Sequence, residues 1–377
     1  MENKQILSKL TLVILTYQRP EYALRNIRYW SGRGARLLVL DGSPDPLSAD
    51  ALQGLSDTVE YIHGHTSLVD RFRIALTLVN TPYTALLGDD EFFLPSALVA
   101  SIEALEAEPD LVACMGQAIG FGISNPPEVN GFSVYPKHAG YEITSNSPGT
   151  RMHAHMGDYA CSTIYSVVRT ESWKRAFAIF VAKEFPVYAI GELQFELAIS
   201  YFGKSRVIPV LHWLRSFETE SVEGTEEDNP SLDRKNIFHE WWSAPDKGEF
   251  RKEFLRDASV ALAQTDGRDV MAVSKEIEVA MDAYANLCLG QIRQNLRTQL
   301  KSYLPDSVIN AIRSVLRAYR LFTCRDPTSK HKTPLQLAAQ QMAIKGMQVN
   351  YDELSEVIDI IKNFHANNQL HGLNHRL

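Results

Sequence analysis

The first third of the chain alternates short apolar runs with longer amphipathic stretches. Residues Leu10–Thr16 are β-branched and almost wholly apolar, the pattern of a strand buried on both faces of a parallel sheet. Similar strands are predicted at 36–40, 59–63, 83–87 and 111–115, and helices at 20–29, 47–55, 66–79 and 95–106. Strands that alternate with helices over short connections predict an α/β fold with a mostly parallel, doubly wound sheet.

The pattern changes twice further along. Residues 117–160 are rich in Gly, Pro, Asn and Ser, which predicts loops with short strands. Helices at 170–182 and 192–201 and a strand at 207–211 follow, and from about residue 236 the periodicity is helical throughout. We therefore expect one α/β domain over 1–235, with halves at 1–116 and 117–235, and an all-α domain over 236–377.

Composition excludes several classes of protein. The chain has 377 residues, 45% of them apolar, which favours a globular protein over a disordered one. Its net charge of −7 argues against nucleic-acid binding. The four cysteines form no CxxC pair, so we expect neither a zinc site nor a disulfide framework. No run approaches the ~20 apolar residues of a membrane span, nor does a signal-peptide pattern occur, so a cytoplasmic protein is expected.

An acidic run, Asp89-Asp90-Glu91, follows the strand predicted at 83–87. Three adjacent carboxylates repel one another, and a hard cation would relieve that repulsion. Mn²⁺ and Mg²⁺ accept oxygen ligands from one or two carboxylates together with phosphates and water. In an extended chain Asp89 and Glu91 would point to the same side. The alternative is a solvated turn before the helix at Pro95.

Polar residues also end the first and second strands. Thr16 can meet a nucleotide, and the Arg19 guanidinium can pair with a diphosphate, although an ordinary loop has the same residues. Asp41 can bond a ribose hydroxyl or a base N–H, or it can be a turn residue in Asp-Gly-Ser-Pro. Ligands of such sheets bind beyond the carboxyl ends of the strands, so we expect these side chains to surround one site.

Together these segments resemble the GT-A nucleotide-sugar glycosyltransferases, particularly the family 2 type. The resemblance rests on Thr16-Tyr17-Gln18-Arg19-Pro20, Leu-Val-Leu-Asp41-Gly-Ser and Leu-Leu-Gly-Asp89-Asp90-Glu91, in that order. It covers about the first 215 residues. It implies that the first two segments hold the nucleotide and that the third is an Asp-X-Asp-like motif for metal and donor diphosphate. Asp89 would face the donor, while Asp90 and Glu91 would bind the divalent metal.

Five further residues have candidate roles, most of them implied by the resemblance. Glu192, at the start of a helix, would be the general base that takes the proton of the acceptor hydroxyl, with Glu196 as a substitute. Asp158 would contact the donor sugar or acceptor, and His212 would be a further metal ligand. Arg71 would reach the nucleotide or its phosphates. The alternatives are a helix first-turn acid at Glu192, a packed histidine at His212 and a solvated charge at Arg71.

The implied activity is metal-dependent, inverting transfer of a sugar from a UDP-type donor to a hydroxyl of a glycan or lipid-linked acceptor, in bacterial surface polysaccharide synthesis. A sugar nucleotidyltransferase is disfavoured because the loop after the first strand contains no glycine. A dinucleotide oxidoreductase is disfavoured because no GxGxxG follows a strand. A non-catalytic sugar-nucleotide-binding or scaffold protein stays open.

Residues 285–332 are strongly basic, with nine Lys and Arg against two Asp. A basic amphipathic helix can lie on an anionic membrane, which would place the protein peripherally at the inner face of the membrane. The alternative is a helix that packs on the α/β domain or in a homodimer.

Overall fold

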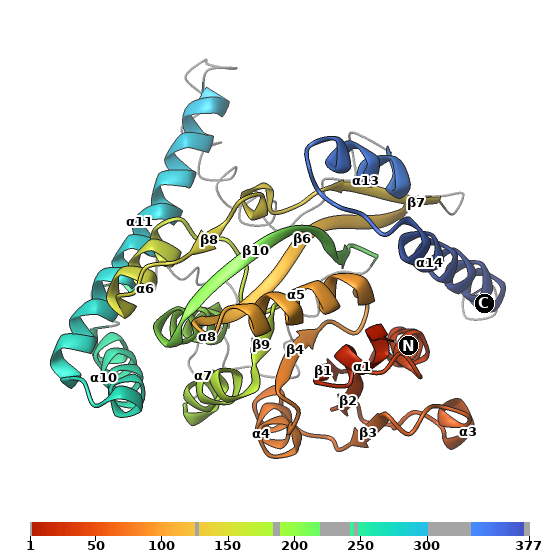
Figure 1. Ribbon diagram of the computed structural model, residues 1–377, viewed down its shortest axis with the longest axis horizontal. Helices are drawn as coiled ribbons and strands as arrows, with labels where there is room; N and C mark the ends of the chain where they lie inside the picture. The colour runs from red at the N-terminus through yellow and green to blue at the C-terminus, as the bar shows by residue number, and fades with distance from the viewer. Residues whose placement is uncertain are drawn as a thin grey trace, which may run out of the picture.

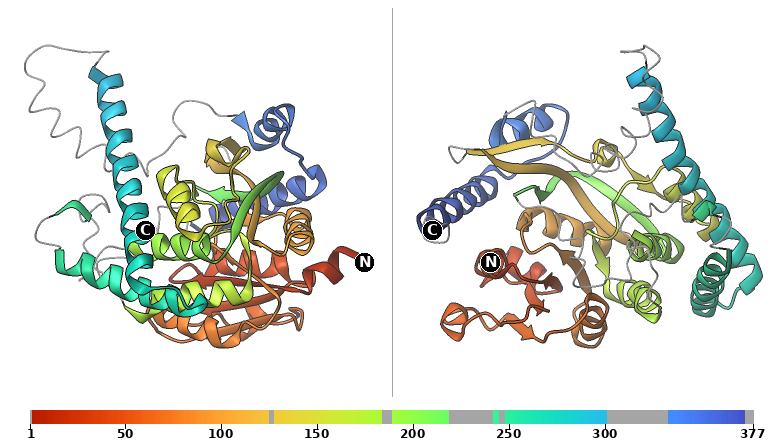
Figure 2. Two further views of the ribbon diagram at one scale, coloured as in Figure 1. Left: turned by 60° about the vertical axis from the view of Figure 1, so that its left-hand side comes forward. Right: turned by 180° about the vertical axis from the view of Figure 1, so that it is seen from behind.

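The computed structural model describes residues 2–124, 128–183, 189–218, 242–244, 248–300 and 333–372. A long twisted sheet crosses the molecule, and helices lie on both of its faces (Figures 1 and 2). The protein is therefore a mixed α/β protein, as its pattern of apolar and polar residues predicts.

Four strands form the parallel part of the sheet, in the order β3-β2-β1-β4. They are β1 (Leu10–Thr16), β2 (Arg36–Asp41), β3 (Val59–His63) and β4 (Tyr83–Leu87). Short β9 (Val167–Arg169) runs antiparallel between β4 and β6 (Leu111–Ser124), and β10 (Lys204–Ser216) pairs with β6 in parallel. It follows that β1, β2, β3, β4, β6 and β10 all point the same way, so the mostly parallel sheet is confirmed.

The remaining strands are short or lie toward the edges. They are β5 (Phe92–Phe93), β7 (Glu128–Ser133), β8 (Glu142–Ile143) and β11 (Thr333–Pro334). β5 pairs antiparallel with β10, so that Trp213 lies opposite Phe93 and Leu214 opposite Phe92. This pairing brings the segment that follows the acidic run against the end of β10.

Alternate side chains of the central strands enter two separate hydrophobic cores, as the strand period of two requires. Leu12 and Ile14 of β1 pack in the first core, whereas Val13 between them packs in the second. The first core contains side chains of α1 (Glu2–Leu7), α2 (Pro20–Trp30), α5 (Pro95–Ala107), α13 (Leu335–Ile344) and α14 (Tyr351–Gly372). The second contains those of α4 (Leu68–Leu78), α6 (Pro148–Gly157), α7 (Thr170–Ala182), α8 (Ala189–Phe202), α10 (Gly248–Asp266) and α11 (Val270–Leu300). Short α3 (Ala49–Leu52) and a 3-10 turn at Pro136–His138 complete the described elements.

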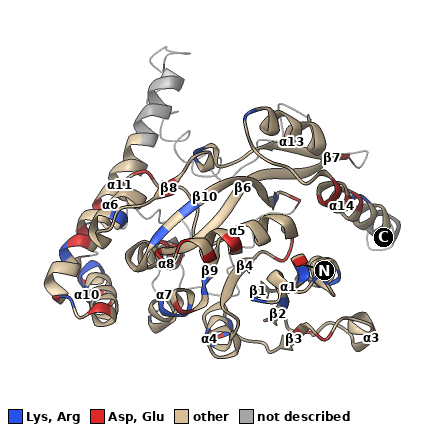
Figure 3. Ribbon diagram, viewed as in Figure 1, with Lys and Arg blue, Asp and Glu red and all other residues tan. Residues whose placement is uncertain are grey.

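The helices expected as one C-terminal unit lie in two places. α10 and α11 share a core with α6, α7 and α8, while α13 and α14 share the other core with α5 and β7 (Figure 1). The helical pattern predicted after residue 236 includes one long helix, α11, over Val270–Leu300. Residues 301–332, which hold most of the predicted basic segment, lie outside the described residues. In the described part of α10 and α11, basic and acidic residues are intermixed (Figure 3).

The region predicted to be loops at 117–160 is more ordered than expected. β6 extends to Ser124, and α6 occupies 148–157. The residues of α6 include two glycines and two histidines, which are weak helix formers, so the sequence did not indicate a helix there. Its packing against α11 supplies what propensity does not. Over the described residues, no helix is both long and apolar enough to span a bilayer.

Candidate functional site

The carboxyl ends of β1 and β4 meet where the strand order reverses. β2 and β3 lie on one side of β1, and β4 lies on the other, so the loops after β1 and β4 leave the sheet at a switch point. The last residue of β1, Thr16, donates from its Oγ1 to Asp89 Oδ2 at 2.8 Å. The predicted meeting of these two segments is thus observed.

Arg19 spans the first two carboxylates of the acidic run. Its Nη1 lies 2.8 Å from Asp89 Oδ1, and its Nη2 lies 2.7 Å from Asp90 Oδ2. The guanidinium fork therefore bridges the two acids, although its single positive charge balances only one of them. Burial nonetheless raises the pKa of Asp89 to about 6, because desolvation and the neighbouring Asp90 outweigh the stabilising charge of Arg19.

The backbone of the acidic run is a turn that two residues of α2 hold in place. Asn26 Nδ2 donates to the carbonyls of Gly88 at 3.0 Å and Glu91 at 2.8 Å. Arg25 Nη2 donates to the carbonyl of Asp90 at 2.8 Å. Sequence analysis did not single out Asn26 or Arg25, although two buried polar residues on a helix that faces the core were a usable signal.

Because this segment is a turn, the prediction that Asp89 and Glu91 point to the same side is wrong. The Glu91 N–H closes the turn onto the Gly88 carbonyl at 3.3 Å, and its side chain accepts a hydrogen bond from the Trp213 indole at 2.9 Å. Glu91 is buried there. Desolvation and the charge of Asp90 raise its pKa to about 8, so this carboxyl is largely protonated at neutral pH.

Asp41, at the end of β2, is joined to the same region through the loops. Its carboxylate accepts from Tyr61 Oη at 2.6 Å and from the Ser43 N–H at 2.8 Å. The Gly42 N–H donates to the Thr16 carbonyl at 3.0 Å, and the Gln18 N–H donates to Ser43 Oγ at 2.8 Å. The ends of β1 and β2 therefore form one connected surface.

Arg71 reaches this surface from α4. Its Nη1 donates to the Thr16 carbonyl at 2.6 Å, and its guanidinium lies 6.0 Å from the centre of the Tyr17 ring. A Cβ at position 42 would lie 2.8 Å from Arg71 Nε, so only glycine at position 42 leaves room for this arginine. Arg71 is buried, which rules out the alternative of a solvated helix charge.

The residues predicted to bind metal do not form a metal site as a set. Glu91 is enclosed beside Trp213, and His212 is fully buried with its ring 4.6 Å from that of Phe93. Neither His212 nitrogen makes a hydrogen bond of ordinary geometry, and burial together with the neighbouring His138 lowers the pKa of His212 to about 3. In the part of the chain that the structure describes, no three His, Cys, Asp or Glu side chains are grouped so as to hold a metal.

Glu192, the predicted base, lies in the first turn of α8. α7 begins at the amino edge of the sheet, directly after β9, and α8 ends at the same edge, where only Gly203 separates it from β10. Because α7 and α8 pack together, α8 begins toward the opposite edge, which carries Thr16 and Asp89. Glu192 Oε1 accepts hydrogen bonds from Tyr159 Oη at 2.7 Å and from Cys161 Sγ at 3.6 Å. Burial raises the pKa of both donors, so they keep their protons.

Glu196, the substitute base, is sealed in the interior. It accepts from His155 Nε2 at 2.7 Å and from the backbone N–H groups of Thr163 at 3.2 Å and Ile164 at 3.0 Å. His155 in turn bonds Tyr141 Oη at 2.7 Å. This network fixes residues 159–165 against α8 and leaves Glu196 no exposed surface.

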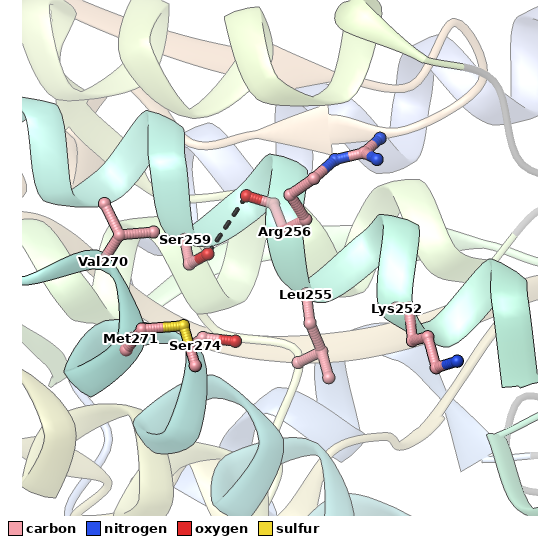
Figure 4. Close-up of a pocket in the computed structure, with 7 residues that line it drawn as sticks. All are labelled: Lys252, Leu255, Arg256, Ser259, Val270, Met271 and Ser274. Carbon is pink, nitrogen blue, oxygen red and sulfur yellow. Dashed lines mark hydrogen bonds between the residues drawn. The ribbon is translucent and has the colours of Figure 1, made fainter.

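Asp158 lies apart from the other predicted residues. It caps the carboxyl end of α6, its side chain is 69% exposed, and it forms an ion pair with Lys137. A small cavity of 210 Å³ also lies apart, between α10 and α11 (Figure 4). Its lining includes none of the predicted site residues: Lys252, Leu255, Arg256, Ser259, Val270, Met271 and Ser274.

No protein-family model and no curated protein matches this chain. Similar solved structures include S. aureus TarS 1–349, with a TM-score of 0.40 and 12% identity over 76% of this chain and 91% of that one. The complex of TarS 1–349 with UDP has a TM-score of 0.41 and 11% identity over 76% of this chain and 91% of that one. The complex with UDP-GlcNAc has a TM-score of 0.42 and 12% identity over 76% of this chain and 92% of that one. TM-scores below 0.5 do not establish a shared function, so only the geometry of the site bears on what this chain does.

Proposed function

We propose that the chain is a glycosyltransferase that binds a nucleotide-sugar donor at the carboxyl ends of β1, β2 and β4. The observation that carries this proposal is the convergence of Thr16, Arg19, Asp89 and Asp90 at the switch point of the sheet. The three segments that resemble the GT-A enzymes are the segments that meet there, which supports a common role for them.

The nucleotide is assigned to the surface that joins β1 and β2. Asp41 would exchange its bond from Tyr61 for a ribose hydroxyl or a base N–H, and Tyr17 with Arg71 would flank the nucleotide. The Arg19 fork fits phosphate oxygens as well as it fits carboxylates, so it can turn from Asp89 and Asp90 to the diphosphate. We take UDP as the nucleotide.

Transfer is assigned to Glu192. The acceptor hydroxyl of a glycan or glycolipid would attack the anomeric carbon while Glu192 takes its proton, and the bond to the nucleoside diphosphate breaks on the opposite side. Such a single displacement inverts the anomeric configuration. Tyr159 and Cys161 would hold the Glu192 carboxylate in place through the bonds to Oε1.

Whether the transfer needs Mn²⁺ or Mg²⁺ is a question for experiment. Asp90, Glu91 and His212 do not fit as a shared ligand set, and Glu91 is a hydrogen-bond acceptor for Trp213 rather than a free carboxylate. Arg19 already supplies a positive charge at Asp89 and Asp90. We therefore derive no step through Mn²⁺ or Mg²⁺.

A second candidate is a non-catalytic sugar-nucleotide-binding or scaffold protein, in which the bonds from Tyr159 and Cys161 would occupy Glu192 instead of positioning it as a base. The two candidates share the donor site and differ at Glu192. Surface polysaccharide synthesis, a homodimer and membrane contact through 285–332 remain predictions, and flotation with anionic liposomes tests the last of these.

The discriminating experiment measures donor hydrolysis and transfer with a panel of nucleotide sugars, with Mn²⁺ and with EDTA. Wild type is compared with Glu192→Gln, and Glu171→Gln is the matched control because it makes the same change at an exposed carboxylate of α7. We expect wild type and Glu171→Gln to turn over a donor, and Glu192→Gln to bind it but lose about 100-fold or more in rate. Full activity in Glu192→Gln would remove the base assignment, and binding without turnover in wild type would favour the second candidate.

A further inference from the structure

A buried ion cluster joins three distant parts of the chain beside the acidic run. Arg25 of α2 donates from Nη1 and Nη2 to the two carboxylate oxygens of Glu218, at 2.9 and 2.7 Å. His365 of α14 bonds Glu218 Oε1 at 2.5 Å. The side chains of Arg25, Glu218 and His365 are 3%, 0% and 19% exposed. A charged cluster buried to this degree has a fixed geometry, because each charge depends on its partners.

Aromatic rings enclose the Arg25 guanidinium. Its centre lies 4.9 Å from the Tyr22 ring, 5.0 Å from Phe92 and 4.5 Å from Phe364. Phe364 also packs on Tyr22, with ring centres 4.9 Å apart. Two neighbouring residues of α14, Phe364 and His365, thus complete the enclosure of an arginine that belongs to α2.

The same guanidinium also reaches the acidic run. Arg25 Nη2 donates to the Asp90 carbonyl at 2.8 Å while it also binds Glu218. Asp90 in turn pairs through its carboxylate with Arg19, whose guanidinium lies 5.3 Å from the same Tyr22 ring. The position of Asp90 is therefore set in part by a side chain that α14 holds in place.

The electrostatics of Glu218 support a tight arrangement. Burial alone would raise its pKa, yet hydrogen bonds and charge from His365 and Arg25 hold the pKa of this carboxyl below its usual range. Glu218 is thus an anion in the interior and depends on the hydrogen bonds of both partners.

We propose that His365 is a positioning residue for the donor site: through Glu218 and Arg25, the last described helix fixes the backbone at Asp90. α14 lies beside the N-terminal part of the chain (Figure 1), where its Phe364 ring packs on Tyr22 of α2. The expected effect on nucleotide binding rests on the proposed function, whereas the coupling between α14 and the backbone at Asp90 does not.

α14 offers a matched control for this idea. Glu356 also ties α14 to the turn that follows α2, through an ion pair with Arg33. That pair is more exposed, with 45% for Glu356 and 26% for Arg33, and no contact from it to the acidic run is seen in the described residues. Cutting the Arg33–Glu356 pair weakens the docking of α14 without touching Arg25. Any effect peculiar to His365 therefore reports on the route through Glu218.

The experiment compares wild type, His365→Ala, His365→Gln and Glu356→Ala by amide hydrogen exchange over 86–94 and by titration with UDP. Since coupling through such networks is worth ~0.5–2 kcal/mol, we expect His365→Ala to raise exchange and weaken UDP binding by about 2- to 30-fold. His365→Gln, which keeps a donor, is expected to recover most of the loss, and Glu356→Ala to resemble wild type.

Two outcomes would overturn the proposal: unchanged exchange over 86–94 in His365→Ala, or an equal increase in Glu356→Ala. If wild type binds no nucleotide but His365→Ala alone loosens 86–94, the coupling is supported and the proposed function fails. Melting temperatures of all four proteins show whether any variant has simply lost its fold.

Discussion

Glu91 gives a prediction with an unusual sign. Replacing a buried carboxyl usually destabilises a protein. Glu91 is expected to be an exception, because its burial raises its pKa to about 8 against an ordinary value of 4.5. The folded protein therefore holds a proton at Glu91 that the unfolded chain releases between about pH 4.5 and 8. The stability associated with neutral Glu91 is complete below pH 4.5 and is lost as the pH rises toward 8.

The magnitude follows from the shift. Each pKa unit corresponds to about 1.4 kcal/mol, so at pH 7, 2.5 units above the ordinary value, the loss is about 3 kcal/mol. Glu91→Gln keeps an acceptor for the Trp213 indole and cannot ionise. Relative to wild type, we expect this variant to gain about 1.4 kcal/mol of unfolding free energy per pH unit from pH 5 to 8.

Urea denaturation followed by circular dichroism at pH 5, 6, 7 and 8 measures this difference directly. Comparing the two proteins at each pH cancels the other titrating groups, and Glu103→Gln on the exposed face of α5 is the control, expected within about 0.5 kcal/mol of wild type. A difference that does not grow with pH, or a variant less stable at pH 8 than at pH 5 relative to wild type, would refute the reasoning. A metal-dependent loss of activity in Glu91→Gln would restore Glu91 as a ligand.

Three further predictions concern groups that hold the site. Gly42→Ala places a Cβ against Arg71 Nε and the Thr66 carbonyl and should cost about 1–3 kcal/mol in thermal or urea denaturation; wild-type stability would mean that Arg71 moves freely. Glu196→Gln weakens the bonds to His155 and Thr163 and should cost about 2–3 kcal/mol, measured the same way, with Glu171→Gln on the exposed face of α7 as control. Tyr61→Phe leaves Asp41 without its hydroxyl donor and should cost about 1 kcal/mol; a gain in stability would contradict the need for that bond.

Much of the fold could be predicted because buried strands leave a plain signal. The apolar runs at Leu10–Thr16 and Tyr83–Leu87 are strands with the predicted bounds, as is the half-buried segment Val59–His63. Pro20 and Pro95 begin the predicted helices. Helix α6 was missed because its stability comes from α11, more than a hundred residues away in sequence. Local propensity contains no information about such a partner.

The site was predictable in part for the same reason. The carboxyl ends of neighbouring parallel strands lie side by side whatever conformation their loops adopt. For this reason Thr16, Arg19 and Asp89 lie together. The orientation of Glu91 was not predictable, because a turn at Asp89-Asp90 replaces the extended chain that the period of two assumes. The roles of Asn26 and Trp213 depend on contacts 65 and 122 residues apart, which no local pattern encodes.

The central claim is that a nucleoside diphosphate binds at Thr16, Arg19 and Asp89, and calorimetric titration tests it most directly. UDP, GDP and CDP are titrated into wild type, Arg19→Ala and the distant control Arg256→Ala, with and without Mn²⁺. The account predicts that one diphosphate binds wild type and Arg256→Ala equally, and that Arg19→Ala binds it about 10-fold or more weakly, because a charge-assisted fork to phosphate is lost. No binding of any diphosphate to wild type, or equal binding to Arg19→Ala, would contradict it.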